Sequence, residues 1–130
     1  MATIEFKKNF IHYIFVKIKI EKMNWITLII AGLFEVGFAT CLGKIKASNG
    51  ANSFPWLIGF LFCLSLSMYL LYKATQSLPI GTAYAVWTGV GAAGTALIGI
   101  FLFKEPAEFW RLFFIFSLIA SVIGLRVVSN

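Results

Sequence analysis

One acidic residue lies inside otherwise apolar sequence. The stretch NWITLIIAGLFEVGFATCL, from Asn24 to Leu42, contains Glu35 and no other acidic or basic residue. A charged carboxylate at membrane depth is costly without a partner, and such residues usually face a bundle interior or a water-filled pathway. Basic residues stand only at the ends of the apolar runs. We therefore expect Glu35 to bind protons and a visiting cation in turn, although a protonated Glu35 could also serve as a hydrogen bond between helices.

Two aromatic residues could complete a cation site. Tyr84 and Trp87 are three residues apart in LPIGTAYAVWTGVGAAG, so they share one face of a helix. Their rings suit a cation, whereas the alternative role is anchoring at the depth of the lipid headgroups. Ser65 and Ser67, in another apolar run, have hydroxyls that could bond a carboxylate or the preceding helical turn.

Three glycines form a literal GxGxxG: Gly89, Gly91 and Gly94. A dinucleotide fingerprint needs a preceding strand and an aqueous βαβ unit, so we exclude that interpretation inside an apolar run. The glycines instead predict close helix packing or a hinge. In the last apolar run, two pairs of small residues four positions apart indicate a dimer seam or packing within one subunit: Ser117 with Ser121, and Ala120 with Gly124.

Other kinds of site are not indicated. Cys41 and Cys63 have neither CxxC spacing nor a neighbouring histidine, so no metal site, disulfide or cofactor is expected. His12, the single histidine, lies outside the apolar runs, and no pair of nucleophile and base can be assembled. An enzyme is therefore the least supported function.

Composition places the chain in a membrane. Hydrophobic residues make up 60% of 130 residues and charged residues only 12%, whereas soluble domains are about 45–50% apolar. Four apolar runs are each close in length to a transmembrane helix of about 20 residues. They are 24–43, 55–72, 80–103 and 110–128. The runs are continuously apolar, whereas the strands of a membrane β-barrel alternate apolar and polar residues, so a barrel is excluded. The sequence predicts an all-α protein with four transmembrane helices.

Residues 23–130 are expected to form one transmembrane transporter domain. Residues 1–22 differ, because five lysines interrupt every apolar run before it could span. This extension lacks the features of a cleaved signal peptide. It is either a basic helix at the membrane surface or a segment upstream of a true start at Met23, and we favour the second interpretation.

The basic residues of the four-helix domain orient it only weakly. Two lie on the side of the N-terminus and four on the other side: Lys73 and Arg126 against Lys44, Lys46, Lys104 and Arg111. Their expected role is contact with lipid headgroups, and no nucleic acid is expected as a partner despite the net charge of +6. So small a bias permits insertion in both directions and an antiparallel dimer, unless the five lysines of the extension hold the N-terminus in the cytoplasm.

Residues 23–130 resemble the small multidrug resistance transporters. The similarity rests on AGLFEV, SLPIGTAYAVWTGVGAAG, FKEP and IGLRVVS, and the form GTAYAVWTG is similar to the guanidinium exporter branch. The resemblance implies an antiparallel dimer of four-helix subunits in the cell membrane. It further implies export of a cation in exchange for protons at a central site.

The resemblance also implies roles for individual residues. Glu35 corresponds to the shared carboxylate, Ser67 to a serine that hydrogen-bonds it, Tyr84 to a gating tyrosine and Trp87 to an aromatic wall. Phe38 departs from the family pattern, because guanidinium exporters usually have tryptophan there after EVV, whereas this chain reads EVGF. The loss of an indole donor could broaden the range of cations.

Three functions therefore stay open. The first is a proton-coupled exporter of guanidinium-type cations. The second is a multidrug exporter of quaternary ammonium and other hydrophobic cations, either as a homodimer or with a paralogous subunit. The third is a membrane subunit that transports nothing and uses Glu35 only to join helices.

Overall fold

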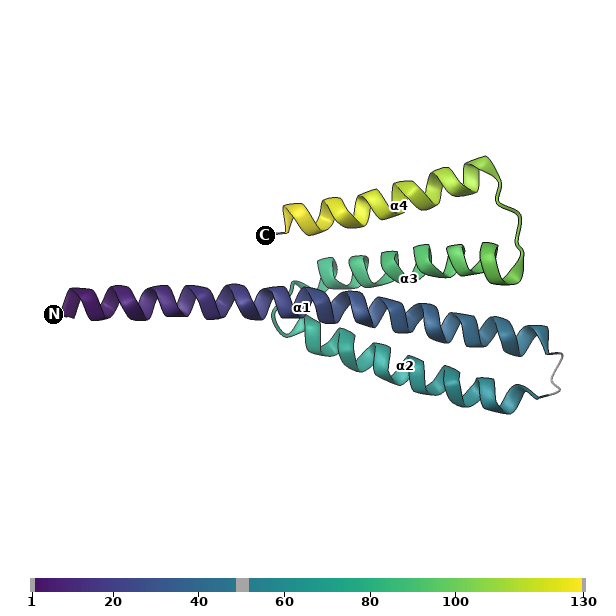
Figure 1. The fold of residues 1–130 in the computed structure, drawn as a ribbon, viewed down its shortest axis with the longest axis horizontal. Coiled ribbons are helices and arrows are strands. Elements are labelled where there is room, and N and C mark those ends of the chain that lie inside the picture. Colours follow the sequence, from purple (N-terminus) through teal and green to yellow (C-terminus); the bar gives the residue numbers. More distant parts are fainter. Residues whose placement is uncertain (1, 49–51, 130) are drawn as a thin grey trace.

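Four long helices form the molecule in the computed structural model, which describes residues 2–48 and 52–129. Successive helices alternate in direction (Figure 1), and no strand occurs in the described ranges. All four are long and apolar enough to cross a membrane. The predicted fold class is thereby confirmed for one subunit. The helices are α1 (Ala2–Ala47), α2 (Ser53–Thr75), α3 (Ile80–Phe103) and α4 (Phe109–Val128).

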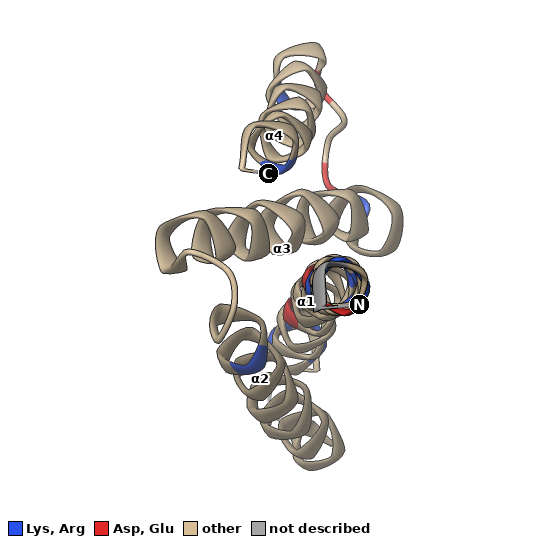
Figure 2. Ribbon diagram, turned by 90° about the vertical axis from the view of Figure 1, so that its left-hand side faces the viewer, with Lys and Arg blue, Asp and Glu red and all other residues tan. Residues whose placement is uncertain are grey.

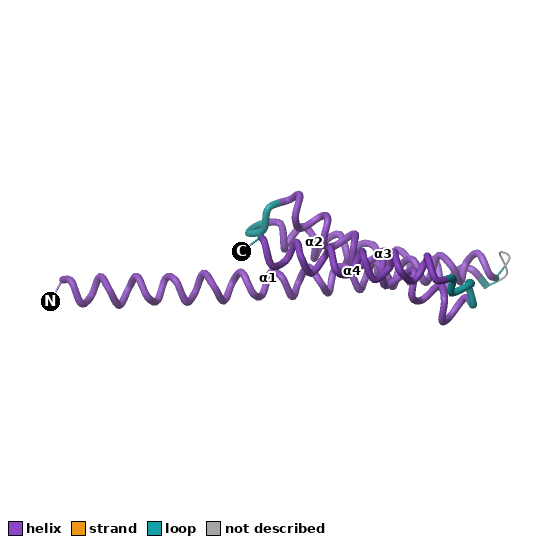
Figure 3. The backbone as a smooth tube through the Cα atoms, turned by 90° about the horizontal axis from the view of Figure 1, so that it is seen from above, coloured by secondary structure: helices purple, strands orange, loops and turns teal. Residues whose placement is uncertain are grey.

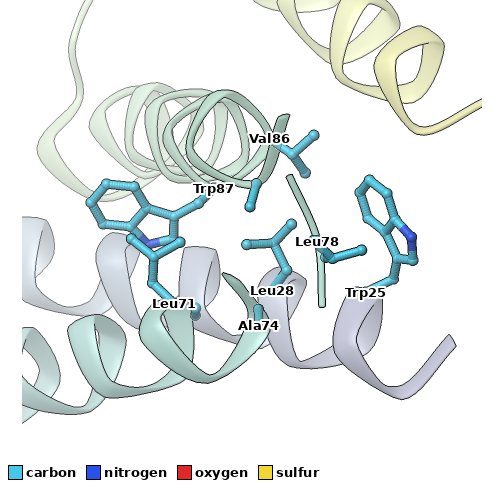
Figure 4. Close-up of a cluster of buried hydrophobic side chains, with 9 residues drawn as sticks. Trp25, Leu28, Leu71, Ala74, Leu78, Val86 and Trp87 are labelled. Atoms are coloured by element: carbon cyan, nitrogen blue, oxygen red, sulfur yellow. The ribbon is translucent and has the colours of Figure 1, made fainter. Parts of the chain in front are cut away.

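The buried core lies where α1, α2 and α3 meet, near the end of the bundle that contains the α2–α3 turn. Its side chains are apolar and come from all three helices and the turn (Figure 4). α4 packs against α3, and near its C-terminal end the Arg126 guanidinium lies 4.0 Å from the ring centroid of Trp25 in α1. The core residues are Trp25, Leu28, Ala31, Leu71, Ala74, Leu78, Ala83, Val86 and Trp87.

α1 and α2 approach each other through two reciprocal contacts. A Cβ added to Gly37 would lie 3.2 Å from the Cys63 sulfur, and one added to Gly59 would lie 3.2 Å from the Cys41 sulfur. Each helix therefore presents a glycine and a cysteine four residues apart, and the small residue of one fits the larger residue of the other. This pairing could not be predicted from the sequence of either helix alone.

The glycines of α3 also mark close approaches. A Cβ at Gly89 would overlap Val122 of α4, and one at Gly94 would overlap Val36 of α1. In α4, Gly124 faces open space within the subunit, and Ser121 donates a hydrogen bond to its own helix at the Ser117 carbonyl. The α3 glycines thus serve packing within one subunit.

α1 continues without a break through the junction at Met23, from Ala2 to Ala47. Its N-terminal part projects beyond the other helices (Figures 1 and 3). Figure 2 shows that charged residues gather on this projecting part and near the helix ends, whereas most of α2, α3 and α4 is uncharged. The five lysine side chains of the extension are all exposed.

Candidate functional site

Glu35 lies on α1 directly against α3. Its side chain is half-buried, and a Cβ at Gly91 would occupy the same space as its carboxyl group. The carboxyl oxygen Oε2 is buried and has no hydrogen-bond partner among residues 2–48 and 52–129. Buried polar atoms are almost always hydrogen-bonded, so this unpaired oxygen is a candidate to bind a proton or a cation.

A chain of hydrogen bonds joins three helices beside this carboxyl group. Trp87 Nε1 of α3 donates to Ser67 Oγ at 3.1 Å, and Ser67 Oγ donates to the Ala31 carbonyl of α1 at 2.7 Å. Ala31 precedes Glu35 by four residues, so its carbonyl also faces the Glu35 amide in a regular helix. Ser67 is fully buried and fixes the turn of α1 that immediately precedes the carboxylate.

This arrangement differs from the contact that the family resemblance implied for Ser67. The single hydroxyl proton goes to the Ala31 carbonyl, and the oxygen accepts the indole N–H of Trp87. The side chain therefore positions the backbone below Glu35 in this subunit. Sequence spacing alone could not distinguish a backbone acceptor from a carboxylate.

Tyr84 and Trp87 lie side by side on α3. Their ring centroids are 5.2 Å apart and the planes are inclined by 53°, as the three-residue spacing predicts. Trp87 is 6% exposed and reaches toward Leu71 of α2 (Figure 4), whereas Tyr84 is 55% exposed. The aromatic surface that is open to a visiting cation thus belongs mainly to Tyr84.

Phe38 forms an apolar wall one turn beyond Glu35. Its ring meets Phe60 of α2 edge to face, with centroids 5.8 Å apart and an interplanar angle of 86°. Neither ring has a polar hydrogen to donate. Phe60 was not found from the sequence, because a phenylalanine in an apolar span has no distinguishing signal.

Thr88, like Phe60, has no distinguishing signal in the sequence. Its hydroxyl is buried and has no hydrogen-bond partner among the described residues. Thr88 precedes Gly91 by three residues, so the two share a face of α3. Gly91 on this face contacts Glu35. The unpaired Thr88 hydroxyl, one turn away, is a further polar group that could contact a bound ion.

Comparison with known proteins identifies the family. The model described as "Small Multidrug Resistance protein" matches residues 23–119. The chain belongs to the small multidrug resistance family. It is accordingly a multi-pass membrane transporter of the cell membrane, with four helices long and apolar enough to span it.

Several relatives of this small multidrug resistance protein are similar over most of the chain. A "Guanidinium exporter" of Yersinia pestis is 46% identical over 107 residues, which cover 82% of this chain and 100% of that protein. The "Guanidinium exporter" of Escherichia coli is 43% identical over 108 residues, covering 83% and 100%. A "Probable guanidinium efflux system subunit GdnD" of Bacillus subtilis is 37% identical over 107 residues, covering 82% and 99%.

The family match also delimits the site. It begins at Met23, so Glu35, Ser67, Tyr84 and Trp87 lie inside it and residues 1–22 lie outside. The projecting part of α1 is thus additional to the small multidrug resistance fold.

Proposed function

We propose that the protein exports guanidinium or guanidinyl-type small cations across the cell membrane in exchange for protons. The observation that supports this most directly is the buried Glu35 oxygen without a partner, in a family whose similar members are named guanidinium exporters. In this proposal the protein moves its substrate across the membrane and does not convert it chemically.

The exchange follows from the neutralisation of one carboxyl group. A charged carboxylate inside the bilayer is costly, so Glu35 is stable when it binds either a proton or a cation. Binding of a cation displaces the proton, and protonation releases the cation. Because one site cannot hold both, movement of the cation in one direction is coupled to movement of protons in the other.

Guanidinium fits such a site by shape as well as charge. It is planar, and two of its N–H groups can donate to the two oxygens of one carboxylate. The exposed ring of Tyr84 offers a π face for the same cation. Ser67 and Trp87 hold the preceding turn of α1 in place and leave the carboxylate free.

The active unit is proposed to be an antiparallel pair of subunits. Two such subunits would bring two Glu35 carboxylates to one central site, with the exposed face of Tyr84 toward the partner. The second subunit is either another copy of this chain or a paralogous four-helix chain. The name "subunit" of the Bacillus subtilis relative is in keeping with the latter.

A broader range of cations is the second candidate, and Phe38 favours it. The edge-to-face pair of Phe38 and Phe60 forms an apolar wall near Glu35 without a hydrogen-bond donor. Quaternary ammonium ions have no N–H group and bind through charge and aromatic faces. Transport of such ions would make the protein a multidrug exporter with the same coupling to protons.

Purified protein in liposomes tests the proposal. An outward guanidinium gradient should drive protons into the vesicles, recorded with an internal pH-sensitive dye. Glu35→Gln should abolish the exchange, because an amide cannot alternate between a proton and a cation. Glu108→Gln, at an exposed loop position, is the matched control and should exchange normally.

Two outcomes would contradict the proposal. The first is an absence of exchange by the unmodified protein with guanidinium and with tetraethylammonium. The second is normal exchange by Glu35→Gln, which would indicate that the carboxyl group only joins helices.

A further inference from the structure

The extension of α1 brings a large positive charge to one end of the bundle. The end from which the extension projects, which also contains the α2–α3 turn and the C-terminus, has two basic residues from the family fold, Lys73 and Arg126. The other end has four. The extension adds five lysines to the first end, so its total becomes seven against four: Lys7, Lys8, Lys17, Lys19 and Lys22.

These lysines are placed where they count for orientation. Basic residues retain the flanking segment in the cytoplasm when they lie within about 15–20 residues of a membrane span. α1 is one unbroken helix from the extension into the span, and all five lysine side chains are exposed. Glu5 and Glu21 scarcely offset them, because acidic residues contribute little to this bias.

The structure gives no support for an alternative position of the extension along the membrane surface. That position would require a bend between the extension and the span, and the helix has none in the region of Met23. The lysines therefore stay at the N-terminal end of the bundle as part of a straight helix.

We propose, in place of a start at Met23, that residues 1–22 are part of the protein and are an orientation signal that fixes the N-terminus and the C-terminus of this chain in the cytoplasm. The family fold alone, with two basic residues against four, has a weak bias of the opposite sign. The extension reverses that bias. Every copy that contains the extension then inserts in the same direction.

This orientation determines the partner, on the basis of the antiparallel pairing proposed above. Copies that all point in one direction cannot pair antiparallel in a cell. The second carboxylate of the site must come from a four-helix subunit of the opposite orientation, one without a basic N-terminal segment. The protein is thus one half of an unequal pair.

Labelling of cysteines in intact cells tests the orientation. Cys41 and Cys63 are first replaced by serine, and a single cysteine is introduced as Ala107→Cys in the α3–α4 loop or as Ser129→Cys at the C-terminal end. A thiol reagent that cannot cross the membrane should label position 107 in intact cells. It should label position 129 only after the cells are permeabilised.

Neutralisation of the lysines should change this pattern. With all five lysines changed to glutamine, position 129 should also become labelled in intact cells. With all five changed to arginine, which retains the charge, the original pattern should persist. If the glutamine variant does not accumulate, only Lys17, Lys19 and Lys22 are changed to glutamine, which leaves four basic residues at each end of the bundle. This variant should be labelled at both positions in intact cells.

Two results would overturn the orientation signal. One is labelling of both positions in intact cells that make the unmodified chain. The other is an unchanged pattern in whichever glutamine variant accumulates.

A gain of function tests the partner. In a host without its own guanidinium exporters, the full chain alone should give no tolerance to guanidinium, whereas the five-glutamine variant should give tolerance because it inserts both ways. Equal tolerance from both would overturn the unequal pair. Detergent-purified full chain can enter liposomes in both directions. Exchange in liposomes therefore tests the proposed function alone, whereas labelling and tolerance in cells test the orientation and the unequal pair.

Discussion

Gly91 of α3 lies directly against the carboxyl group of Glu35 on α1. Any side chain at position 91 would occupy the space that the carboxyl group now fills. Only glycine at position 91 leaves room for the carboxyl group of Glu35, the proposed ion-binding group. This role is additional to close helix packing.

Gly91→Ala should abolish proton-coupled exchange in the liposome assay. The new methyl group displaces the Glu35 carboxyl group, and overpacking of this kind costs about 1–3 kcal/mol of stability. Circular dichroism should still show a helical protein. Gly81→Ala is the control, because a Cβ there meets nothing within 4 Å, and it should exchange normally. Normal exchange by Gly91→Ala would show that the carboxyl group can move aside without loss of function.

Ser67→Ala should lower the thermal stability of the protein in detergent. The change leaves the Trp87 indole N–H without its acceptor, and an unsatisfied buried group costs about 1–3 kcal/mol. Exchange should also slow, because the turn that precedes Glu35 loses its link to α2. Ser65→Ala, at an exposed position, should melt like the unmodified protein. Equal melting temperatures for the two variants would contradict the buried hydrogen-bond chain.

Phe38→Trp should raise the preference for guanidinium over tetraethylammonium. The indole adds an N–H donor one turn from Glu35, and a donor can fix the orientation of the carboxylate. The measurement is the ratio of exchange rates with the two cations. Phe38→Leu, which removes the ring and adds no donor, should slow tetraethylammonium exchange without speeding guanidinium exchange, whereas Phe38→Trp should speed guanidinium exchange. If the tryptophan variant keeps the original ratio, position 38 does not determine the range of cations.

Gly59→Val should destabilise the packing of α1 against α2. A Cβ at this position would already lie 3.2 Å from the Cys41 sulfur, so the two further methyl groups must push the helices apart. We expect a cost of about 1–3 kcal/mol, measured as a fall in melting temperature. Gly81→Val, which faces open space, provides the comparison for the loss of glycine alone. Similar melting of both variants would mean that the contact has no effect on stability.

The sequence was sufficient to predict four transmembrane helices and Glu35 as the acidic residue within one of them, because continuous apolar runs and a lone carboxylate are visible without a structure. The spacing of Tyr84 and Trp87 likewise predicted that their rings share a face, and they do. Such arguments work because they depend on one helix at a time.

Contacts between helices were harder to predict. Gly91 was selected from its motif, but the group it contacts depends on the rotation of α1 about its own axis. The bond from Ser67 to the Ala31 carbonyl depends on the relative height of two helices. The pairing of Gly37 with Cys63 was not predicted, because a sequence does not reveal which helices meet.

The uninterrupted course of α1 makes it a lever. At 1.5 Å per residue, its tip stands about 30 Å beyond Met23, while the same rod holds Glu35 inside the bundle. Any tilt of this helix that opens the cation site to one side of the membrane is magnified at the tip. A fluorescent dye attached there would follow each transport cycle from outside the bilayer, without touching the site that drives it.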